Sequence, residues 1–334
     1  MSNALREIRG LTPQAIGDEI LNATQPLLLR GLVSDWPLVK AGLVSSHSAA
    51  VYLLRFYRGA PVDTKLAAPQ TQGRYFYNDD LSGFNFSSEQ HRLDDVLAAL
   101  ERHERDQAAP SIYVGSTAVD TCLPGLLTEN DLSLGERKPL VSIWIGNRSR
   151  IAAHHDVPDN IACVAAGRRR FTLFPPQQLE NLYVGPIDFN PAGQAISLVD
   201  FANPDYEKYP RFAEALRHAQ VAELGPGDAI FIPSLWWHHV ESLDGFNVLI
   251  NYWWRKSPHY LGSPITALMH GILSLRDLPP EQRDAWHAIF RHYVFEAGDQ
   301  TVAHIPPAAR SALSRLDETV ANALCAQIVK RLGR

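Results

Sequence analysis

Two histidines and one aspartate have the residue types and spacing of a metal site. His154 and Asp156 stand two residues apart, and His238 follows much later in a run that continues into His239. Two imidazoles and one carboxylate can hold a divalent iron on one face and leave the opposite face open for a substrate and oxygen. The set therefore indicates the iron site of an oxygenase.

Short strands must position these three residues. Side chains two apart on a strand point to the same side, so His154 and Asp156 can bind one ion while His155 faces away. The surrounding runs are rich in β-branched and aromatic residues, which predicts strands at 140–145, 160–165 and 170–174, with a turn at Gly167.

The third ligand lies on a second strand segment. Gly225-Pro-Gly-Asp228 is a strong turn signal, and 229–232 is an apolar run typical of a buried strand. Either His238 or His239 then lies near the far end of this segment, and spacing alone does not choose between them.

An HxD triplet alone is a weak signal, because the chain has 13 histidines and most histidines are surface residues or hydrogen-bonded core residues. The strand context, the histidine after a Gly-Pro turn and the pair Trp236 and Trp237 together favour a metal site.

Composition limits the class of protein. The 334 residues are 46% hydrophobic and 20% charged, which is ordinary for a soluble globular protein. The net charge of −5 gives no general attraction to phosphate or anionic lipid, so nucleic acid and membranes are not expected partners. Three cysteines without metal-like spacing, no apolar signal core at the amino terminus and no long apolar segment predict a cytoplasmic location.

The pattern along the chain predicts a mainly β region at 1–255 followed by a helical region at 256–334. The strands dominate from about 111 to 255, with a long loop at 185–210. The other expected elements are helices at 12–22, 86–107, 265–275, 280–295 and 307–332, and a strand at 26–30. The apolar stripe from Leu313 to Ile328 is interpreted as core by default, with a subunit contact as the alternative.

Three segments carry a family resemblance. "HHDVPDNIACVAAGRRRFTLFPP", "GPGDAIFIPSLWWHHV" and "NVLINYWW" resemble the cupin-like branch of the JmjC oxygenases, which includes an asparaginyl hydroxylase. The similarity runs in order over roughly residues 20–255 and includes "PLLLRGLVSDWP". It implies a double-stranded β-helix, or jelly-roll, fold with flanking helices, and the use of Fe(II), 2-oxoglutarate and O2.

The resemblance also implies residue roles. His154, Asp156 and His238 correspond to the metal ligands, because the family ligand directly follows the tryptophan pair. Asn160 and Asn251 match positions that line the co-substrate or ligand region. Tyr113 matches a tyrosine that hydrogen-bonds the tail of 2-oxoglutarate; the simpler alternative for these last three is an ordinary strand amide or aromatic ring.

Two positions depart from the family pattern. Arg169 stands where close relatives have a lysine that pairs with the distal carboxylate of 2-oxoglutarate. Alternation with Phe171 and Leu173 points Arg169 into the barrel, where an anionic ligand would relieve a costly unpaired cation; a surface arginine is the alternative. Ile151 replaces a residue that can carry a hydroxyl, so 2-oxoglutarate affinity is expected to be modest, or another oxo-acid to fit.

The resemblance implies hydroxylation, with a protein or peptide side chain as the expected substrate and a small molecule as the alternative. The C-terminal helices are expected to form a homodimer that builds a groove for an extended peptide. A metal-binding module without turnover and a cupin enzyme that uses no oxo-acid are the rival classes. Four tryptophans are candidates for shaping the pocket: Trp236, Trp237, Trp253 and Trp254.

Overall fold

The computed structural model describes residues 4–191 and 193–333 and divides the chain into two compact units, 1–256 and 257–334. The sequence-based boundary was one residue earlier. No helix among the described residues is both long enough and apolar enough to cross a membrane.

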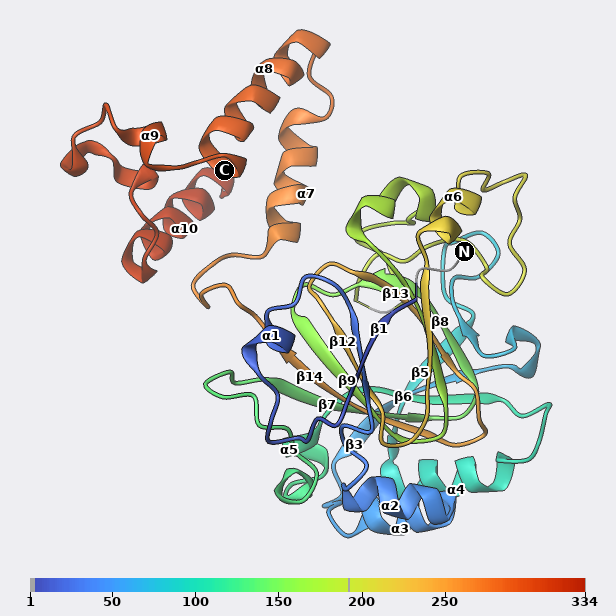
Figure 1. Ribbon diagram of the computed structural model, residues 1–334. Helices are drawn as coiled ribbons and strands as arrows, with labels where there is room; N and C mark the ends of the chain where they lie inside the picture. Colours follow the sequence, from blue (N-terminus) through green and yellow to red (C-terminus); the bar gives the residue numbers. More distant parts are fainter. Residues whose placement is uncertain (1–3, 192, 334) are drawn as a thin grey trace. The chain divides into compact units, whose positions relative to one another are not determined.

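The first unit is built on two sheets, which face each other across the interior (Figure 1). The nine-stranded sheet has the order β1 (Arg6–Arg9), β2 (Leu27–Arg30), β12 (Ala229–Ile232), β9 (Asp159–Ala166), β14 (Asn247–Trp254), β7 (Leu140–Gly146), β6 (Ser111–Ala118), β3 (Pro61–Ala67) and β5 (Phe86–Arg92). The five-stranded sheet has the order β11 (Gln220–Leu224), β10 (Arg169–Phe174), β13 (Trp237–Ser242), β8 (Ser149–His155) and β4 (Arg74–Tyr75). The expected mainly β, jelly-roll class is confirmed.

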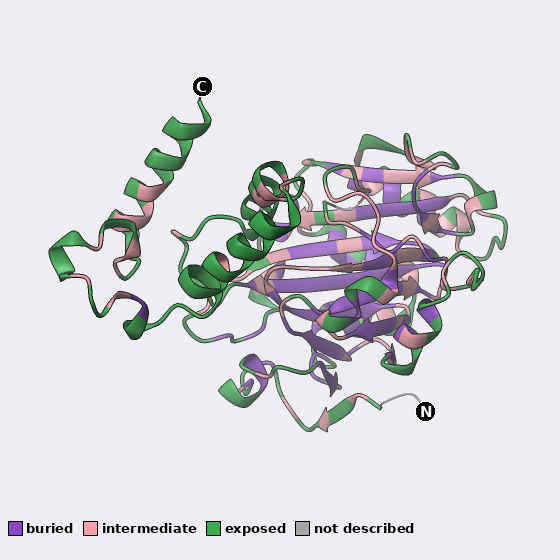
Figure 2. Ribbon diagram, turned by 90° about the horizontal axis from the view of Figure 1, so that it is seen from above, coloured by how far each residue is buried: buried purple, intermediate pink, exposed green. Residues whose placement is uncertain are grey.

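Alternation along the central strands separates two cores. On β9, Ile161 and Cys163 face the helical side, whereas Ala162 and Val164 face the other sheet. Every residue of β9 is buried, which is why this strand reads as an unbroken apolar run. Figure 2 shows the central strands as the buried part of the first unit.

Short helices cover the outer side of the large sheet. They are α1 (Asp18–Leu21), α2 (Pro37–Val44), α3 (Ser46–Leu54), α4 (Leu93–His103) and α5 (Val119–Cys122), with α6 (Phe212–Arg217) elsewhere in the unit. The expected strand at 26–30 is confirmed as β2. The helix expected at 12–22 is wrong for most of its length, because the helical turn is confined to α1.

The helix expected at 86–107 is also partly wrong. Residues 86–92 form β5, which pairs in register with β3, and the helix begins only at Leu93. All four apolar residues that suggested the helix lie within α4, so its amphipathic pattern never extended into 86–92.

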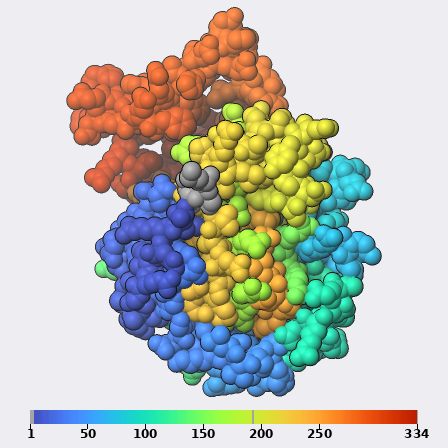
Figure 3. All heavy atoms as spheres, turned by 45° about the vertical axis from the view of Figure 1, so that its right-hand side comes forward, coloured from blue at the N-terminus to red at the C-terminus, as the bar shows by residue number. Residues whose placement is uncertain are grey.

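The segment between β10 and β11 is irregular, as expected for 185–210, and Figure 3 shows it as a yellow lobe on the surface of the first unit. A small core of its own holds it, formed by Phe174, Leu182, Phe212 and Trp237. Within it, Val184 and Ser197 form an isolated bridge, and the Ser197 N–H donates to Ala153 O of β8 at 2.7 Å, which ties the segment to the smaller sheet.

The second unit contains α7 (Pro264–Leu275), α8 (Pro280–Phe290) continued by a π-helical turn at Arg291–Phe295, α9 (Asp299–Val302) and α10 (Glu318–Leu332). The last helix was expected from 307 but begins at Glu318, where Asp317 caps it by accepting a hydrogen bond from the Val320 N–H. The core interpretation of the Leu313–Ile328 stripe is wrong, because Leu316 and Ile328 are exposed.

The turn at Gly167 gives the first testable prediction. Gly167 and Gly135 both have positive φ, +68° and +64°, but a Cβ at Gly167 would collide with Phe246 O and Asn247 Oδ1, whereas one at Gly135 would meet nothing within 4 Å. We expect Gly135→Ala to lower the free energy of unfolding by about 1–2 kcal/mol, the backbone cost alone, and Gly167→Ala to lower it further. Urea denaturation measures both, and equal losses would contradict the collision.

Candidate metal and co-substrate site

The two histidines of the predicted triad come from neighbouring strands. His154 on β8 pairs directly with His238 on β13, and their ring centroids are 4.3 Å apart. Paired residues of antiparallel strands project on the same side of the sheet. The ladder between β8 and β13 therefore brings the two imidazoles together.

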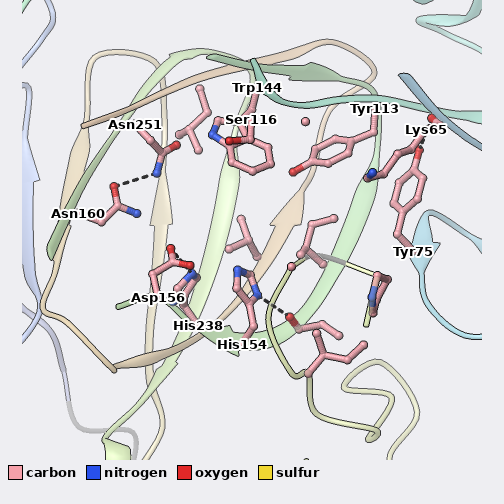
Figure 4. A pocket seen from close by; sticks show the side chains of 18 of the residues that line it. Lys65, Tyr75, Tyr113, Ser116, Trp144, His154, Asp156, Asn160, His238 and Asn251 are labelled. Atoms are coloured by element: carbon pink, nitrogen blue, oxygen red, sulfur yellow. Dashed lines mark hydrogen bonds and ion pairs between the residues drawn. The ribbon is translucent and has the colours of Figure 1, made fainter. Parts of the chain in front are cut away.

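Asp156 joins them from just beyond the end of β8. Its Oδ2 lies 3.7 Å from His238 Nε2, and one ligand atom from each of the three residues falls within 4.8 Å of the others. Figure 4 shows the three side chains converging at one side of a pocket. The structure thus brings together the three residues predicted as metal ligands.

Hydrogen bonds to the backbone orient both rings. His154 Nδ1 lies 2.9 Å from Ala152 O and His238 Nδ1 lies 3.0 Å from Trp236 O. A carbonyl oxygen only accepts, so each Nδ1 carries the proton and each Nε2 keeps its lone pair. Burial lowers the pKa of His238 to about 4, so this ring is neutral at physiological pH, the state that a metal ligand requires.

The neighbouring histidines point elsewhere. His155 packs edge-on against Trp237 at a centroid distance of 4.7 Å, and His239 packs on Phe201 at 4.5 Å. Neither lines the pocket, and burial lowers the pKa of His239 to about 3. The geometry therefore selects His238 rather than His239 as the partner of His154 and Asp156.

The pocket beside the triad has a volume of about 430 Å³. Every residue predicted for the site lines this pocket, and both sheets contribute: Tyr113, His154, Asp156, Asn160, Arg169, His238 and Asn251. Ile151, the position where a hydroxyl is missing, also lines it.

Arg169 is a buried cation without a partner. Only 2% of the residue is exposed, and within the described residues its side chain makes no hydrogen bond or ion pair. Burial lowers the pKa of Arg169 to about 10, so the guanidinium remains charged at neutral pH. The inward orientation is confirmed, and the surface alternative is wrong. A buried charge of this kind is costly unless an anion pairs with it.

Tyr113 and the two asparagines add polar groups to the lining. Tyr113 is close enough to Arg169 for the cation to favour its ionised form, although burial raises its pKa overall. Asn251 Nδ2 donates to Asn160 Oδ1 at 2.8 Å, which ties β14 to β9, while Asn251 Oδ1 has no partner among the described residues. A buried acceptor without a donor is a further place for a ligand or a water.

Sequence reasoning missed several lining residues, among them Lys65, Tyr75, Ser116 and Trp144. The Trp144 ring lies between Tyr113 and Trp253, at centroid distances of 5.7 and 5.9 Å. Alternation on β7 allowed Trp144 to face either way, and Lys65 and Tyr75 belong to no motif. Ser116 lies where the register of β6 with β7 shifts, so its direction did not follow from that of Tyr113.

Of the four tryptophans proposed to shape the pocket, only Trp253 lines it. Trp236 packs between the two sheets, Trp237 belongs to the small core of the irregular segment, and Trp254 stacks on Phe231 on the helical side. Alternation along β14 explains the last case, because Trp253 and Trp254 must face opposite sides.

Comparison with known proteins identifies the family. The sequence pattern of the Cupin-like domain matches residues 13–260. The chain belongs to the cupin-like family of JmjC-type proteins. The resemblance seen in the sequence is therefore confirmed.

Three proteins that resemble this chain over most of its length share low sequence identity with it. Human HSPB1-associated protein 1 is 26% identical over 294 residues, which cover 84% of this chain and 58% of the relative. Lysine-specific demethylase 8 of Xenopus tropicalis is 25% identical over 240 residues, 71% of this chain and 49% of the relative. Mouse tRNA wybutosine-synthesizing protein 5 is 26% identical over 314 residues, 83% of this chain and 90% of the relative. The chain spans about half the length of rat HSPB1-associated protein 1, at 52%.

The opposite orientations of His155 and Asp156 give a direct prediction for metal binding. We expect Asp156→Ala to abolish stoichiometric binding of Mn(II) or Co(II), because one of the three predicted ligands is lost. The matched control, His155→Ala, removes an imidazole that packs on Trp237 outside the pocket and should retain binding. Calorimetric titration of the metal-free protein measures both. Loss of binding in the His155 variant alone would contradict the assignment.

Proposed function

We propose that the protein is an Fe(II)- and 2-oxoglutarate-dependent oxygenase that hydroxylates its substrate. The observation that carries the proposal is the combination, in one pocket, of the His154, Asp156 and His238 cluster with the unpaired buried cation of Arg169. The cluster suits a divalent iron, and the cation suits the distal carboxylate of an oxo-acid.

Each pocket residue has a role in this proposal. His154, Asp156 and His238 hold the iron. Arg169 pairs with the distal carboxylate of 2-oxoglutarate, and the Tyr113 hydroxyl donates a hydrogen bond to the same group. Because Ile151 offers no hydroxyl, Arg169 carries a larger share of this binding than a lysine supported by such a hydroxyl.

When bound together, iron, 2-oxoglutarate and O2 supply oxidative decarboxylation to succinate and CO2 coupled to insertion of one oxygen atom into a C–H bond. The chain's own contribution is to aim that C–H bond and to exclude water. Trp144, Trp253 and Phe171 form apolar walls of the pocket and serve the second purpose.

We propose a protein or peptide side chain as the substrate. The names of two relatives, HSPB1-associated protein 1 and lysine-specific demethylase 8, support a protein-directed activity. The relative that is matched over 90% of its length is named for tRNA, which makes a tRNA-linked group the second candidate. The net charge of −5 argues against broad binding of RNA, so nucleic acid remains an unexpected partner.

Arg169 provides the sharpest test of the co-substrate. We expect Arg169→Met to weaken 2-oxoglutarate binding by at least about tenfold, since a charge-assisted contact contributes about 1.5–3 kcal/mol, and Arg169→Lys to restore part of it. Arg168→Met is the matched control, because Arg168 is half exposed and pairs with Asp244 outside the pocket. Calorimetry with the Mn(II)-loaded protein without oxygen measures the affinities.

Turnover is measured as succinate formed after oxygen is added to the Fe(II)-loaded protein. We expect slow succinate formation in the wild type, none in Asp156→Ala, and a higher 2-oxoglutarate requirement in Arg169→Met. If the metal loads but 2-oxoglutarate does not bind, the oxygenase is the wrong function. A metal-binding module or a cupin enzyme without an oxo-acid then becomes the better description.

We also propose that the second unit forms a homodimer contact. Among its described residues only Thr301 is buried, while Leu273 is 79%, Phe295 77% and Val329 62% exposed. Large apolar side chains exposed in such number on one small helical unit indicate a surface that another chain covers. A second copy is the occupant proposed here.

Sedimentation at micromolar concentrations tests the dimer. We expect the full chain to sediment as a dimer, and Leu273→Glu together with Phe295→Glu to shift it towards the monomer. Val44→Glu is the matched control, because Val44 is 77% exposed on α2 of the first unit. A monomeric wild type, or dissociation caused equally by Val44→Glu, would contradict this interface.

A further inference from the structure

Asp156 differs from the two histidines in how it is held. His154 and His238 lie within β8 and β13 and are fixed by the ladder between these strands. Asp156 lies one residue past the end of β8, so no strand pairing fixes its backbone. A carboxylate ligand outside regular structure needs other contacts to keep its place beside the rings.

Those contacts come from the turn that precedes β13. Leu235 N–H donates to Asp156 O at 2.8 Å, Ser234 Oγ donates to Val157 O, and Ser234 N–H donates to Asp159 Oδ1 at 3.0 Å. Three hydrogen bonds thus join the segment that carries Asp156 to the segment that leads into His238.

The turn itself is under backbone strain. Leu235 has φ +66°, in the left-handed region that a leucine rarely adopts, and 45% of the residue is exposed. A strained conformation persists only where surrounding contacts determine it. The bonds to Asp156 and Asp159 are those contacts, so weakening them allows the turn and the aspartate to move together.

Asp159 connects this turn to a third segment. Its side chain is only 4% exposed, and its second oxygen, Oδ2, lies 3.1 Å from Lys256 Nζ. Lys256 is two residues past β14, the strand that brings Asn251 and Trp253 into the pocket. One buried carboxylate therefore receives a backbone N–H from the turn and an ammonium group from the end of the last strand.

We propose that Asp159 and Lys256 are positioning residues for the carboxylate ligand Asp156. This inference rests on the proposed function, in which Asp156 binds the metal. Without Lys256, the buried Asp159 carboxylate loses its only ion-pair partner among the described residues and turns towards water, which removes the acceptor that holds the Ser234 N–H. The alternative is a pair that contributes only to packing.

The experiment compares Lys256→Met, Lys256→Arg, Asp159→Ala and the double variant Asp159→Ala with Lys256→Met in the full chain. Lys40→Met is the matched control, because Lys40 forms an exposed ion pair with Asp35 at 3.2 Å and neither residue lines the pocket. Two readouts are taken without turnover: the Mn(II) dissociation constant by calorimetry, and the visible absorption of the Co(II)-loaded protein, which reports coordination geometry.

We expect Lys256→Met and Asp159→Ala each to weaken Mn(II) binding by about tenfold or more, the size typical of lost outer contacts, and to change the Co(II) spectrum. Lys256→Arg should restore both readouts, Lys40→Met should change neither, and the double variant should be no worse than the worse single variant.

Two results overturn the inference in distinguishable ways. If the wild type binds Mn(II) and 2-oxoglutarate while Lys256→Met and Asp159→Ala match it in affinity and spectrum, the pair does not position Asp156 and only this inference fails. If the wild type binds neither the metal nor 2-oxoglutarate, the proposed function fails and the inference falls with it. Equal losses of thermal stability and of metal affinity in the Lys40 control would also count against a specific role.

Discussion

The candidate site depends on the register between β8 and β13. His154 opposite His238 is one pair in that ladder, and a slip by one residue would turn one imidazole to the far side of the sheet. A bulge follows immediately, since His238 pairs with His154 but Val240 pairs with Ile151. The extra residue on β8 changes which side chains face inward, so Ile151 and His154 both line the pocket although they are three apart.

The sequence predicted which side chains point into the pocket where a strand carries a residue whose type already indicated metal or ligand binding. The two-residue period sufficed for Asp156 and Arg169, because it needs no knowledge of the neighbouring strands, whereas Asn160 was expected only from the family resemblance. The inward orientation of Trp144 and Lys65 was not predictable, since no residue on their strands indicated which face points into the pocket. The β5 segment was mistaken for helix because only its pairing with β3 makes it a strand. The outcome for the Leu313–Ile328 stripe was not predictable either, because apolar spacing on a helix does not show what covers the apolar face.

The polar groups of the pocket oppose folding of the first unit unless ligands join them. Among the described residues, Arg169 has no anionic partner and Asn251 Oδ1 has no donor, and burial holds His238 neutral. Each of these groups is costly in an apolar interior. A buried cation and a buried acceptor beside three potential metal ligands in one cavity favour a binding function over ordinary core packing.

The three proposed metal ligands are held at two levels of rigidity, and this has consequences for regulation of the proposed site. Strand pairing fixes His154 and His238, so only loss of the sheet would separate them. Asp156 depends instead on a strained turn, one buried carboxylate and Lys256, the last residue before the second unit begins. Any event that displaces Lys256 thus reaches Asp156 through the turn, which also carries the Trp236 carbonyl that orients the His238 ring, while the strand pairing of His154 with His238 stays in place. Because the carboxylate is the ligand that neutralises charge on a divalent metal, such a change would weaken metal binding without unfolding the pocket.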